Sequence, residues 1–190
     1  MAARKMASRV RAAASKISGA RKTGARRLAK KRVLPIPKGY HAVTPQLVVR
    51  DADKAIDFYK KVFGAKEKNR MADPSGKVMH AEIQIGDSVV MLQDEFPERG
   101  SRAPQTLGGT SSSLMIYTRD VDTLFERAVS AGATVQMPLS NMFWGDRYGK
   151  LVDPFGHEWQ LGTHVEDVPP REMAKRAAAV MAGGPPQSAP

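Results

Sequence analysis

Hydrophobic and polar positions follow the same order in two stretches of the chain. An apolar run at 46–49 precedes residues 50–65, and a second run at 114–117 precedes residues 119–133. In both stretches apolar residues recur at helical spacing, acidic residues stand where a helix would be capped, and a glycine follows where it should end. Each stretch therefore predicts a strand, a short helix and a glycine stop.

More strands are predicted after each helix, separated by turn sequences such as 73–76 and 153–156. These strands are expected at 66–71, 77–85, 88–93, 134–137, 144–152 and 158–163. The pattern is βαβββ twice, in modules 40–95 and 111–166, and the fold class is α+β. One helix covers one face of each small sheet, so the two open faces are expected to form a cupped mixed sheet.

Both ends of the chain lack this pattern. Residues 1–38 contain thirteen Lys and Arg, no Asp or Glu, and few large apolar residues, so we expect a disordered basic arm. Residues 169–190 open on two prolines, continue with a short helical pattern and end rich in Gly and Pro. That composition predicts a C-terminal helix and a flexible tail, which leaves 39–168 as the globular domain.

Most of the positive charge lies in the arm. The chain has 30 Lys and Arg against 19 Asp and Glu, so without the thirteen basic residues of the arm the balance is 17 against 19, or −2. The charge is therefore no evidence that the domain binds nucleic acid. The arm is interpreted as a solubilising tail or as a weak, salt-dependent contact for nucleic acid or another acidic surface, with an organellar transit peptide as a third alternative.

Several classes of protein are excluded by what the sequence lacks. It contains no cysteine, which removes disulfides, thiolate metal sites and cysteine nucleophiles. No apolar stretch is long enough to span a membrane, and no apolar segment follows the basic N-terminus as in a secretory signal. We therefore expect a cytoplasmic protein.

Two segments of the modules carry a family resemblance. Residues 48–64 and the closing segment 153–159 resemble the vicinal oxygen chelate (VOC) superfamily of glyoxalases, bleomycin resistance proteins and ring-cleaving dioxygenases. A narrower similarity to the PhnB-like branch lies at 80–83, 85–88, 145–147 and 163–168, and bacterial members of that branch share a Lys/Ala-rich leader before a segment like 36–41. The resemblance implies a glyoxalase-like domain but no single chemistry, because this fold hosts many.

The resemblance also implies four metal-ligand positions. In metal-dependent members these positions correspond to Thr44, Met91, Ser113 and Gln160 of this chain. Two hydroxyls, a thioether and one amide do not supply the donors that a divalent ion needs. We therefore expect no metal at the usual site and no other cofactor, unless a divalent ion uses a displaced set of ligands that includes His80 and Glu82. A slip in the first strand would bring Gln46 into the set.

The strand at 77–85 presents a polar face. His80, Glu82 and Gln84 alternate with apolar residues, so they are expected to face the concavity together. A histidine beside a carboxylate suits acid–base catalysis or the binding of a polar ligand. The alternative is an ordinary hydrogen-bonded pair or an oligomer contact.

A second candidate site lies at 143–149, where aromatic residues, glycines and the charged pair Asp146 and Arg147 occur together. Such a segment could clamp a planar or anionic molecule, or it could be a structural hairpin. His164 could complete the rim of a pocket or anchor the C-terminal helix. The full set of candidate ligand-binding residues is Gln46, Gln84, Met91, Tyr117, Trp144, Asp146, Arg147, Gln160 and His164.

These patterns lead to one main hypothesis and two rivals. The main hypothesis is a PhnB-like homodimer that binds a small polar or aromatic metabolite or drug in the concave sheet without the standard metal. The first rival is a metal-dependent lyase, isomerase or dioxygenase that uses the displaced ligands. The second is an interaction protein whose basic arm binds nucleic acid.

Overall fold

The computed structural model describes residues 33–183. The chain divides into two compact units, residues 1–35 and 36–190, and the second contains both predicted modules. Most of the predicted basic arm (1–32) and of the predicted C-terminal tail (184–190) lies outside the described residues, so those predictions stay untested.

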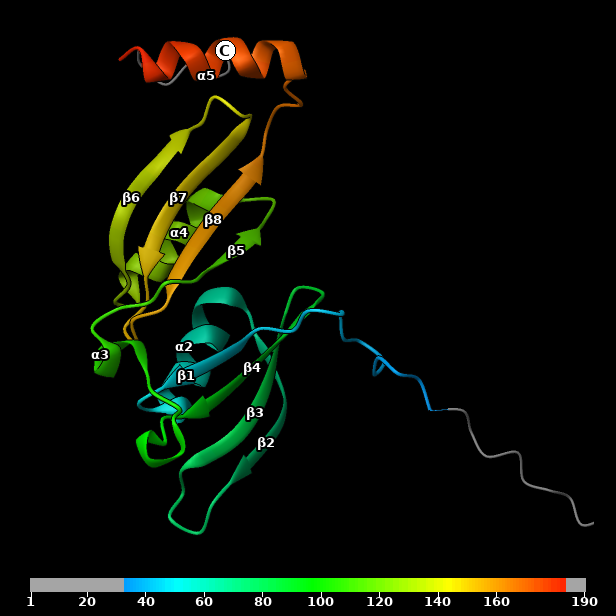
Figure 1. The fold of residues 1–190 in the computed structure, drawn as a ribbon, viewed down its shortest axis with the longest axis vertical. Coiled ribbons are helices and arrows are strands. Elements are labelled where there is room, and N and C mark those ends of the chain that lie inside the picture. The colour runs from blue at the N-terminus through cyan, green and yellow to red at the C-terminus, as the bar shows by residue number, and fades with distance from the viewer. Residues whose placement is uncertain (1–32, 184–190) are drawn as a thin grey trace, which may run out of the picture. The chain divides into compact units, whose positions relative to one another are not determined.

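The first module is a four-stranded mixed sheet with one helix (Figure 1). Its elements are β1 (Gln46–Val49), α2 (Ala52–Phe63), β2 (Lys66–Ala72), β3 (Val78–Ile85) and β4 (Ser88–Asp94). The strands lie in the order β1-β4-β3-β2, with β1 parallel to β4 and the other pairs antiparallel. Leu47, Leu92 and Ala81 form one cross-strand row on the buried face, which packs with α2 in the core.

The second module repeats this topology. Its elements are β5 (Ser113–Tyr117), α4 (Val121–Ser130), β6 (Thr134–Asn141), β7 (Asp146–Val152) and β8 (Glu158–His164), with strand order β5-β8-β7-β6. A further helix, α5 (Pro170–Met181), follows at the C-terminal end. The predicted α+β fold of two βαβββ modules and a C-terminal helix is confirmed, and the two sheets are separate four-stranded sheets.

The two module helices begin as the sequence predicts. The Asp51 carboxylate accepts a hydrogen bond from the Lys54 backbone N–H at 3.1 Å, and Asp120 accepts the equivalent bond from Thr123 at 3.0 Å. Each side chain thereby satisfies a backbone N–H that has no partner inside its helix. At the other end of α2, Gly64 adopts a left-handed conformation with φ of 64° and ends the helix.

The connection between the modules contains two short helices that the sequence analysis does not predict. A single 3-10 turn, η1 (Pro97–Arg99), precedes α3 (Pro104–Leu107), and each begins on a proline and ends at a glycine. Both are about one turn long, so neither produces a periodic apolar stripe that could be recognised in the sequence.

The core joins the two modules through the helix-covered side of the second sheet. The ring of Tyr59 in α2 lies 5.4 Å from that of Trp159 in β8, and Phe63 lies 4.6 Å from the same indole. The Arg127 guanidinium of α4 also donates a hydrogen bond to the Val62 carbonyl oxygen at 3.2 Å. Aromatic burial of this kind supplies much of the hydrophobic stabilisation of a small domain.

A buried carboxylate, Asp153, organises this contact. It is 4% exposed and accepts hydrogen bonds from the Tyr59 hydroxyl at 2.7 Å and the Trp159 indole N–H at 2.8 Å. It also accepts the backbone N–H groups of Phe155 and His157, both at 2.9 Å, which closes the turn between β7 and β8. Burial and the neighbouring carboxylate raise the pKa of Tyr59 well above its usual value, so this hydroxyl stays a donor.

None of the helices in the described part of the chain is long and apolar enough to cross a membrane.

Candidate functional site

The face of the second sheet opposite α4, here called the second open face, carries most of the candidate residues. Strand register places Tyr117, Gly162 and Tyr148 in one cross-strand row, and His164 beside Asp146 in the next. Residues one or three positions away along these strands, Trp159, Leu161 and Leu151, belong to the buried core. Because side chains alternate along a strand, the first set lies on the face away from the core.

Asp146 is the hub of the second open face. It is 4% exposed, and one of its carboxylate oxygens accepts hydrogen bonds from the Tyr117 hydroxyl and the Trp144 indole N–H, both at 3.0 Å. The other oxygen lies 2.7 Å from Nδ1 of His164. Four predicted site residues, on β5, β7, β8 and the turn before β7, therefore meet at one buried carboxylate.

This cluster shifts the protonation of its members. The hydrogen bond to Asp146, with burial as the second cause, raises the pKa of Tyr117 and keeps its hydroxyl protonated. The His164 imidazole has a raised pKa because it is hydrogen-bonded to Asp167 and to Asp146. Neighbouring carboxylates thus stabilise the imidazolium form of His164.

Aromatic rings surround the hub. The Trp144 ring lies edge-on to Phe143 at 5.0 Å and to Tyr148 at 5.5 Å. Tyr117 is 63% exposed, Phe143 and Trp144 are partly exposed, and Tyr148 is buried, so the surface open to a ligand is mainly that of Tyr117 with the exposed parts of Phe143 and Trp144. At Gly162 an added Cβ would lie 2.7 Å from the terminal methyl carbon of Met115, so the glycine gives the β5 side chains room over the sheet.

A glycine holds the hairpin that carries Trp144 against the segment after β8. Gly145 has φ of 96°, and an added Cβ would lie 2.0 Å from the Glu166 carbonyl oxygen. The Gly145 carbonyl oxygen accepts the backbone N–H groups of Val165 and Glu166, at 2.9 and 3.0 Å. The same segment leads into α5, where the Arg176 guanidinium binds the Glu166 carboxylate through two bonds of 2.8 Å.

The first sheet has its own polar open face. Gln46, Met91 and Glu82 form one cross-strand row, and Nε2 of His80 lies 3.1 Å from the Glu82 carboxylate. The structure therefore brings His80 and Glu82 together as the alternating pattern predicts. Gln46 donates a hydrogen bond to the Gln93 amide oxygen at 2.8 Å, and Gln84 accepts one from Lys68 at 3.3 Å.

The sequence analysis did not identify Tyr40 as a partner of this pair. The Tyr40 hydroxyl donates a hydrogen bond to Glu82, and this bond, followed by that from His80, lowers the pKa of the Glu82 carboxyl. The segment before β1 thus reaches the first open face and uses part of the hydrogen-bonding capacity of Glu82. No periodic pattern marks Tyr40, since it stands in an irregular segment.

The four positions implied for a metal do not form a suitable ligand set. The Gln160 amide donates a hydrogen bond to the Ser113 hydroxyl at 2.5 Å, and the Thr44 hydroxyl donates to the His41 carbonyl oxygen at 3.3 Å. Met91 offers only a thioether. Hard and borderline divalent ions bind carboxylate, imidazole or carbonyl groups, so these residues do not fit one. Within residues 33–183, no three His, Asp or Glu side chains come together as a metal site.

Arg147 does not join Asp146 on the second open face. Its guanidinium instead binds the Asp122 carboxylate in the first turn of α4, at 2.6 and 2.5 Å, on the helix-covered side of the sheet. Successive residues of a strand point to opposite faces, so two adjacent charges on β7 cannot both face a ligand there. Arg147 therefore makes a local bond, as in the structural-hairpin alternative, and does not lie with Asp146 as a clamp on the second open face.

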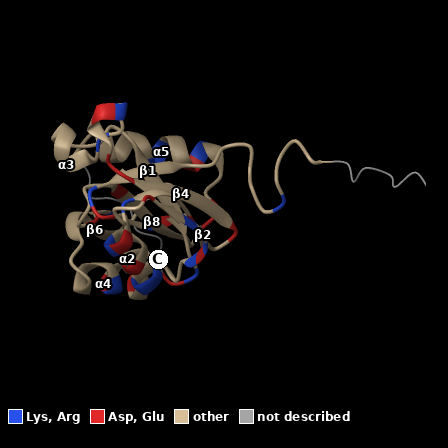
Figure 2. Cartoon of the chain, turned by 90° about the horizontal axis from the view of Figure 1, so that it is seen from below, with Lys and Arg blue, Asp and Glu red and all other residues tan. Residues whose placement is uncertain are grey.

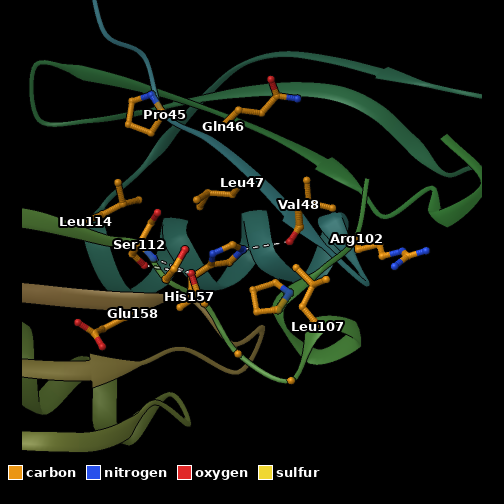
Figure 3. Close-up of a pocket in the computed structure, with 15 residues that line it drawn as sticks. Pro45, Gln46, Leu47, Val48, Arg102, Leu107, Ser112, Leu114, His157 and Glu158 are labelled. Atoms are coloured by element: carbon orange, nitrogen blue, oxygen red, sulfur yellow. Dashed lines mark hydrogen bonds between the residues drawn. The ribbon is translucent and has the colours of Figure 1, made fainter. Parts of the chain in front are cut away.

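Two large cavities lie beside β1 and β5, and Tyr117, a partner of Asp146, lines the second of them. The first, of about 690 Å³, is lined by β1, the connection between the modules and the start of β8 (Figure 3). On its wall Nε2 of His157 donates a hydrogen bond to the Val48 carbonyl oxygen at 3.0 Å, which agrees with a structural role for this histidine. The second, of about 730 Å³, lies between the β3–β4 turn and β5. Neither is lined by Glu82, Asp146 or His164, so neither is the expected shared cup.

Comparison with known proteins identifies the family. The sequence model described as the glyoxalase, bleomycin resistance protein and dioxygenase superfamily matches residues 40–161. The chain belongs to this superfamily. The resemblance to the VOC superfamily is thus confirmed, and the match covers both βαβββ modules.

Three VOC relatives illustrate the similarity. The uncharacterized protein Mb0911c of Mycobacterium bovis is 48% identical over 130 residues, which cover 67% of this chain and 86% of that protein. The crystal structure of TioX from Micromonospora sp. ML1 is 31% identical with a TM-score of 0.53, covering 65% of this chain and 98% of TioX. The PhnB protein from Bacillus cereus has the same fold at 21% identity, with a TM-score of 0.53 and coverage of 65% and 99%.

Proposed function

We propose that this VOC protein binds a small polar or aromatic molecule on its second open face. The observation that supports this most strongly is the buried Asp146 carboxylate, which orients Tyr117, Trp144 and His164 at the edge of a partly exposed aromatic surface. Ligand sites commonly combine apolar or aromatic walls with a few convergent polar groups. The flat rings suit a planar molecule, and the hydroxyl and imidazole suit polar substituents on it.

Quenching of Trp144 fluorescence tests this proposal. The chain has two tryptophans, and Trp159 is 1% exposed, so a ligand on the second open face should quench mainly Trp144. We expect members of a panel of phenols, catechols and quinolines to quench the wild-type protein saturably, and Trp144→Phe to abolish this quenching. A Leu107→Ala variant at the first cavity should quench like wild type. Equal quenching of wild type and Trp144→Phe would contradict the proposal.

We also propose that the protein works without the divalent metal of metal-dependent VOC members. The side chains at the four implied positions support this, because the Gln160 amide bonds to the Ser113 hydroxyl, the Thr44 hydroxyl bonds to the backbone, and the fourth group is only a thioether. The competing enzyme hypothesis requires a displaced set built on His80 and Glu82. There Glu82 already accepts hydrogen bonds from His80 and Tyr40.

A thermal shift experiment separates these alternatives. We expect Mn²⁺, Zn²⁺, Ni²⁺ or Fe²⁺ at millimolar concentration to leave the melting temperature unchanged, and elemental analysis of the purified chain to find no stoichiometric metal. A metal ion present at a hundred times the Kd of its site would stabilise the fold by about 2.7 kcal/mol. A clear rise in melting temperature that His80→Ala removes would support the displaced metal site instead.

The proposed assembly is a cytoplasmic homodimer. Within the described residues, β1 pairs only with β4 and β5 only with β8, so each strand has one edge free for another chain. An exposed apolar side chain, Val43, lies just before the start of β1. A second copy covering this region would protect the strand edges.

The basic arm remains a separate hypothesis. Figure 2 shows acidic and basic positions interspersed over the helices and strands, so in this view the described domain presents no single basic side. Any contact with nucleic acid is therefore expected to depend on residues 1–38. Binding of nucleic acid through the arm is an alternative to small-molecule binding. Most of the arm lies outside the described residues.

A further inference from the structure

Asp146 and His164 are direct cross-strand neighbours on β7 and β8. Nδ1 of His164 lies 2.7 Å from the Asp146 carboxylate, which accepts hydrogen bonds from two other side chains. An ionised carboxylate can only accept hydrogen bonds, so Nδ1 carries the hydrogen and donates it to Asp146. Nε2 is then the nitrogen that gains or loses a proton.

The surroundings of Nε2 leave it accessible. Its partner is Asp167, at 3.0 Å, and the Asp167 side chain is fully exposed while that of His164 is 53% exposed. An exposed carboxylate can rotate into water at little cost, since surface ion pairs contribute little stability. The other charged group nearby, Glu166, is held by Arg176, and Tyr117 binds the opposite oxygen of Asp146.

We infer that Asp146 and His164 form an acid–base dyad in which Nε2 of neutral His164 takes a proton from an O–H group on the second open face. That group belongs to a bound planar molecule, such as a phenol, or to a water beside it. A buried carboxylate that fixes a histidine through Nδ1 while Nε2 faces a substrate is the geometry of a general base. The substrate part of this inference rests on the proposed function, whereas the dyad itself does not.

The proton transfer balances without another reactant. The O–H bond breaks, its electron pair stays on the oxygen, and a new N–H bond forms at Nε2. The resulting imidazolium lies between the carboxylates of Asp146 and Asp167, which stabilise its charge. Returning the proton to the product or to solvent restores neutral His164.

The other histidines of the domain are placed differently. Nε2 of His157 is used as a donor to the Val48 carbonyl oxygen, and His157 is 9% exposed. Nε2 of His80 is bonded to Glu82, which also accepts a hydrogen bond from Tyr40. His41 is an exposed histidine in the segment before β1, so its labelling provides an internal control for exposure to the reagent.

Labelling with diethylpyrocarbonate, followed by peptide mass spectrometry, tests the dyad in the full chain. The reagent modifies neutral imidazole, so the pH profile of each histidine reports its pKa and its nucleophilicity. We expect the fully neutral form of His164 to react several-fold faster than His41. Asp167→Ala should move the His164 midpoint to lower pH, because it removes one carboxylate that favours the imidazolium. A His164 midpoint that Asp167→Ala leaves unchanged, or a neutral His164 that reacts no faster than His41, would overturn the inference.

Hydrolysis of p-nitrophenyl acetate, a planar aromatic ester, is measured in H2O and in D2O, because a lower rate in D2O distinguishes proton transfer from water by His164 from direct attack of Nε2 on the ester. We expect His164→Gln to lower the rate by roughly tenfold or more, because the substitution removes the general base. His41→Gln should leave the rate unchanged. Asp146→Asn should lower it too, provided that its melting curve shows a folded protein. An unchanged rate in His164→Gln would refute the dyad. If planar molecules fail to quench Trp144 while the labelling and hydrolysis results for His164 are as expected, only the proposed ligand site is refuted.

Discussion

Replacing Asp153 by alanine is expected to lower the free energy of unfolding by about 3–5 kcal/mol, the range for removing one partner from a buried charged network. The substitution leaves the Tyr59 hydroxyl and the Trp159 indole N–H without their acceptor in the core that joins the two modules. It also opens the turn between β7 and β8. For a domain of this size we expect the melting temperature, followed by circular dichroism, to fall by roughly 10–15 °C.

A turn of the same sequence type provides the matched control. Asp73 begins the turn between β2 and β3, where it accepts the backbone N–H groups of Ser75 and Lys77 at 2.8 and 3.1 Å. Its remaining bond is to the Ser75 hydroxyl, outside the core. Asp73→Ala should therefore cost only about 1 kcal/mol. Equal losses in the two variants would show that Asp153 serves its turn alone and does not join the modules.

Replacing Gly145 by alanine is expected to cost about 3–5 kcal/mol, because it combines backbone strain with a steric clash. The added methyl group would lie 2.0 Å from the Glu166 carbonyl oxygen, a backbone atom held by its own hydrogen-bonded segment. The hairpin and the segment after β8 must then separate. We expect a lower melting temperature and a red shift of Trp144 emission, since the indole would lose its contact with Asp146.

Gly76→Ala isolates the strain part of this effect. Gly76 has φ of 90°, close to the value at Gly145, and an added Cβ would meet nothing within 4 Å. Its expected cost is about 1–2 kcal/mol, the price of placing a side chain in the left-handed region. If both glycine variants lost the same free energy of unfolding, the close contact between Gly145 and Glu166 would not contribute to the cost of Gly145→Ala.

Local features of the fold were predictable because they depend on residues close in sequence. Asp51 and Asp120 precede apolar helical stripes, and both cap the helices that the sequence predicts. His80 and Glu82 stand two apart on a strand, so alternation alone places them side by side. The same rule places the side chains of Asp146 and Arg147 on opposite faces of β7, which distinguishes the two interpretations of segment 143–149.

Contacts between distant segments were beyond the reach of the sequence. Asp146 and His164 were both candidates, but their contact depends on the register between β7 and β8. Asp153 was identified only as a turn residue, since its partner Tyr59 lies 94 residues away in the other module. Nothing in the sequence around Asp167 or Tyr40 showed which side chain each would bind.

Crystals of the full chain soaked with planar aromatic fragments in the presence of Mn²⁺ would test the central claim most directly. We expect fragments stacked beside Trp144, with polar substituents within hydrogen-bonding distance of His164, and no Mn²⁺ near Ser113 and Gln160. Fragments that contact neither Trp144 nor His164, or an ion held by three or more protein ligands at the usual metal position, would contradict the central claim.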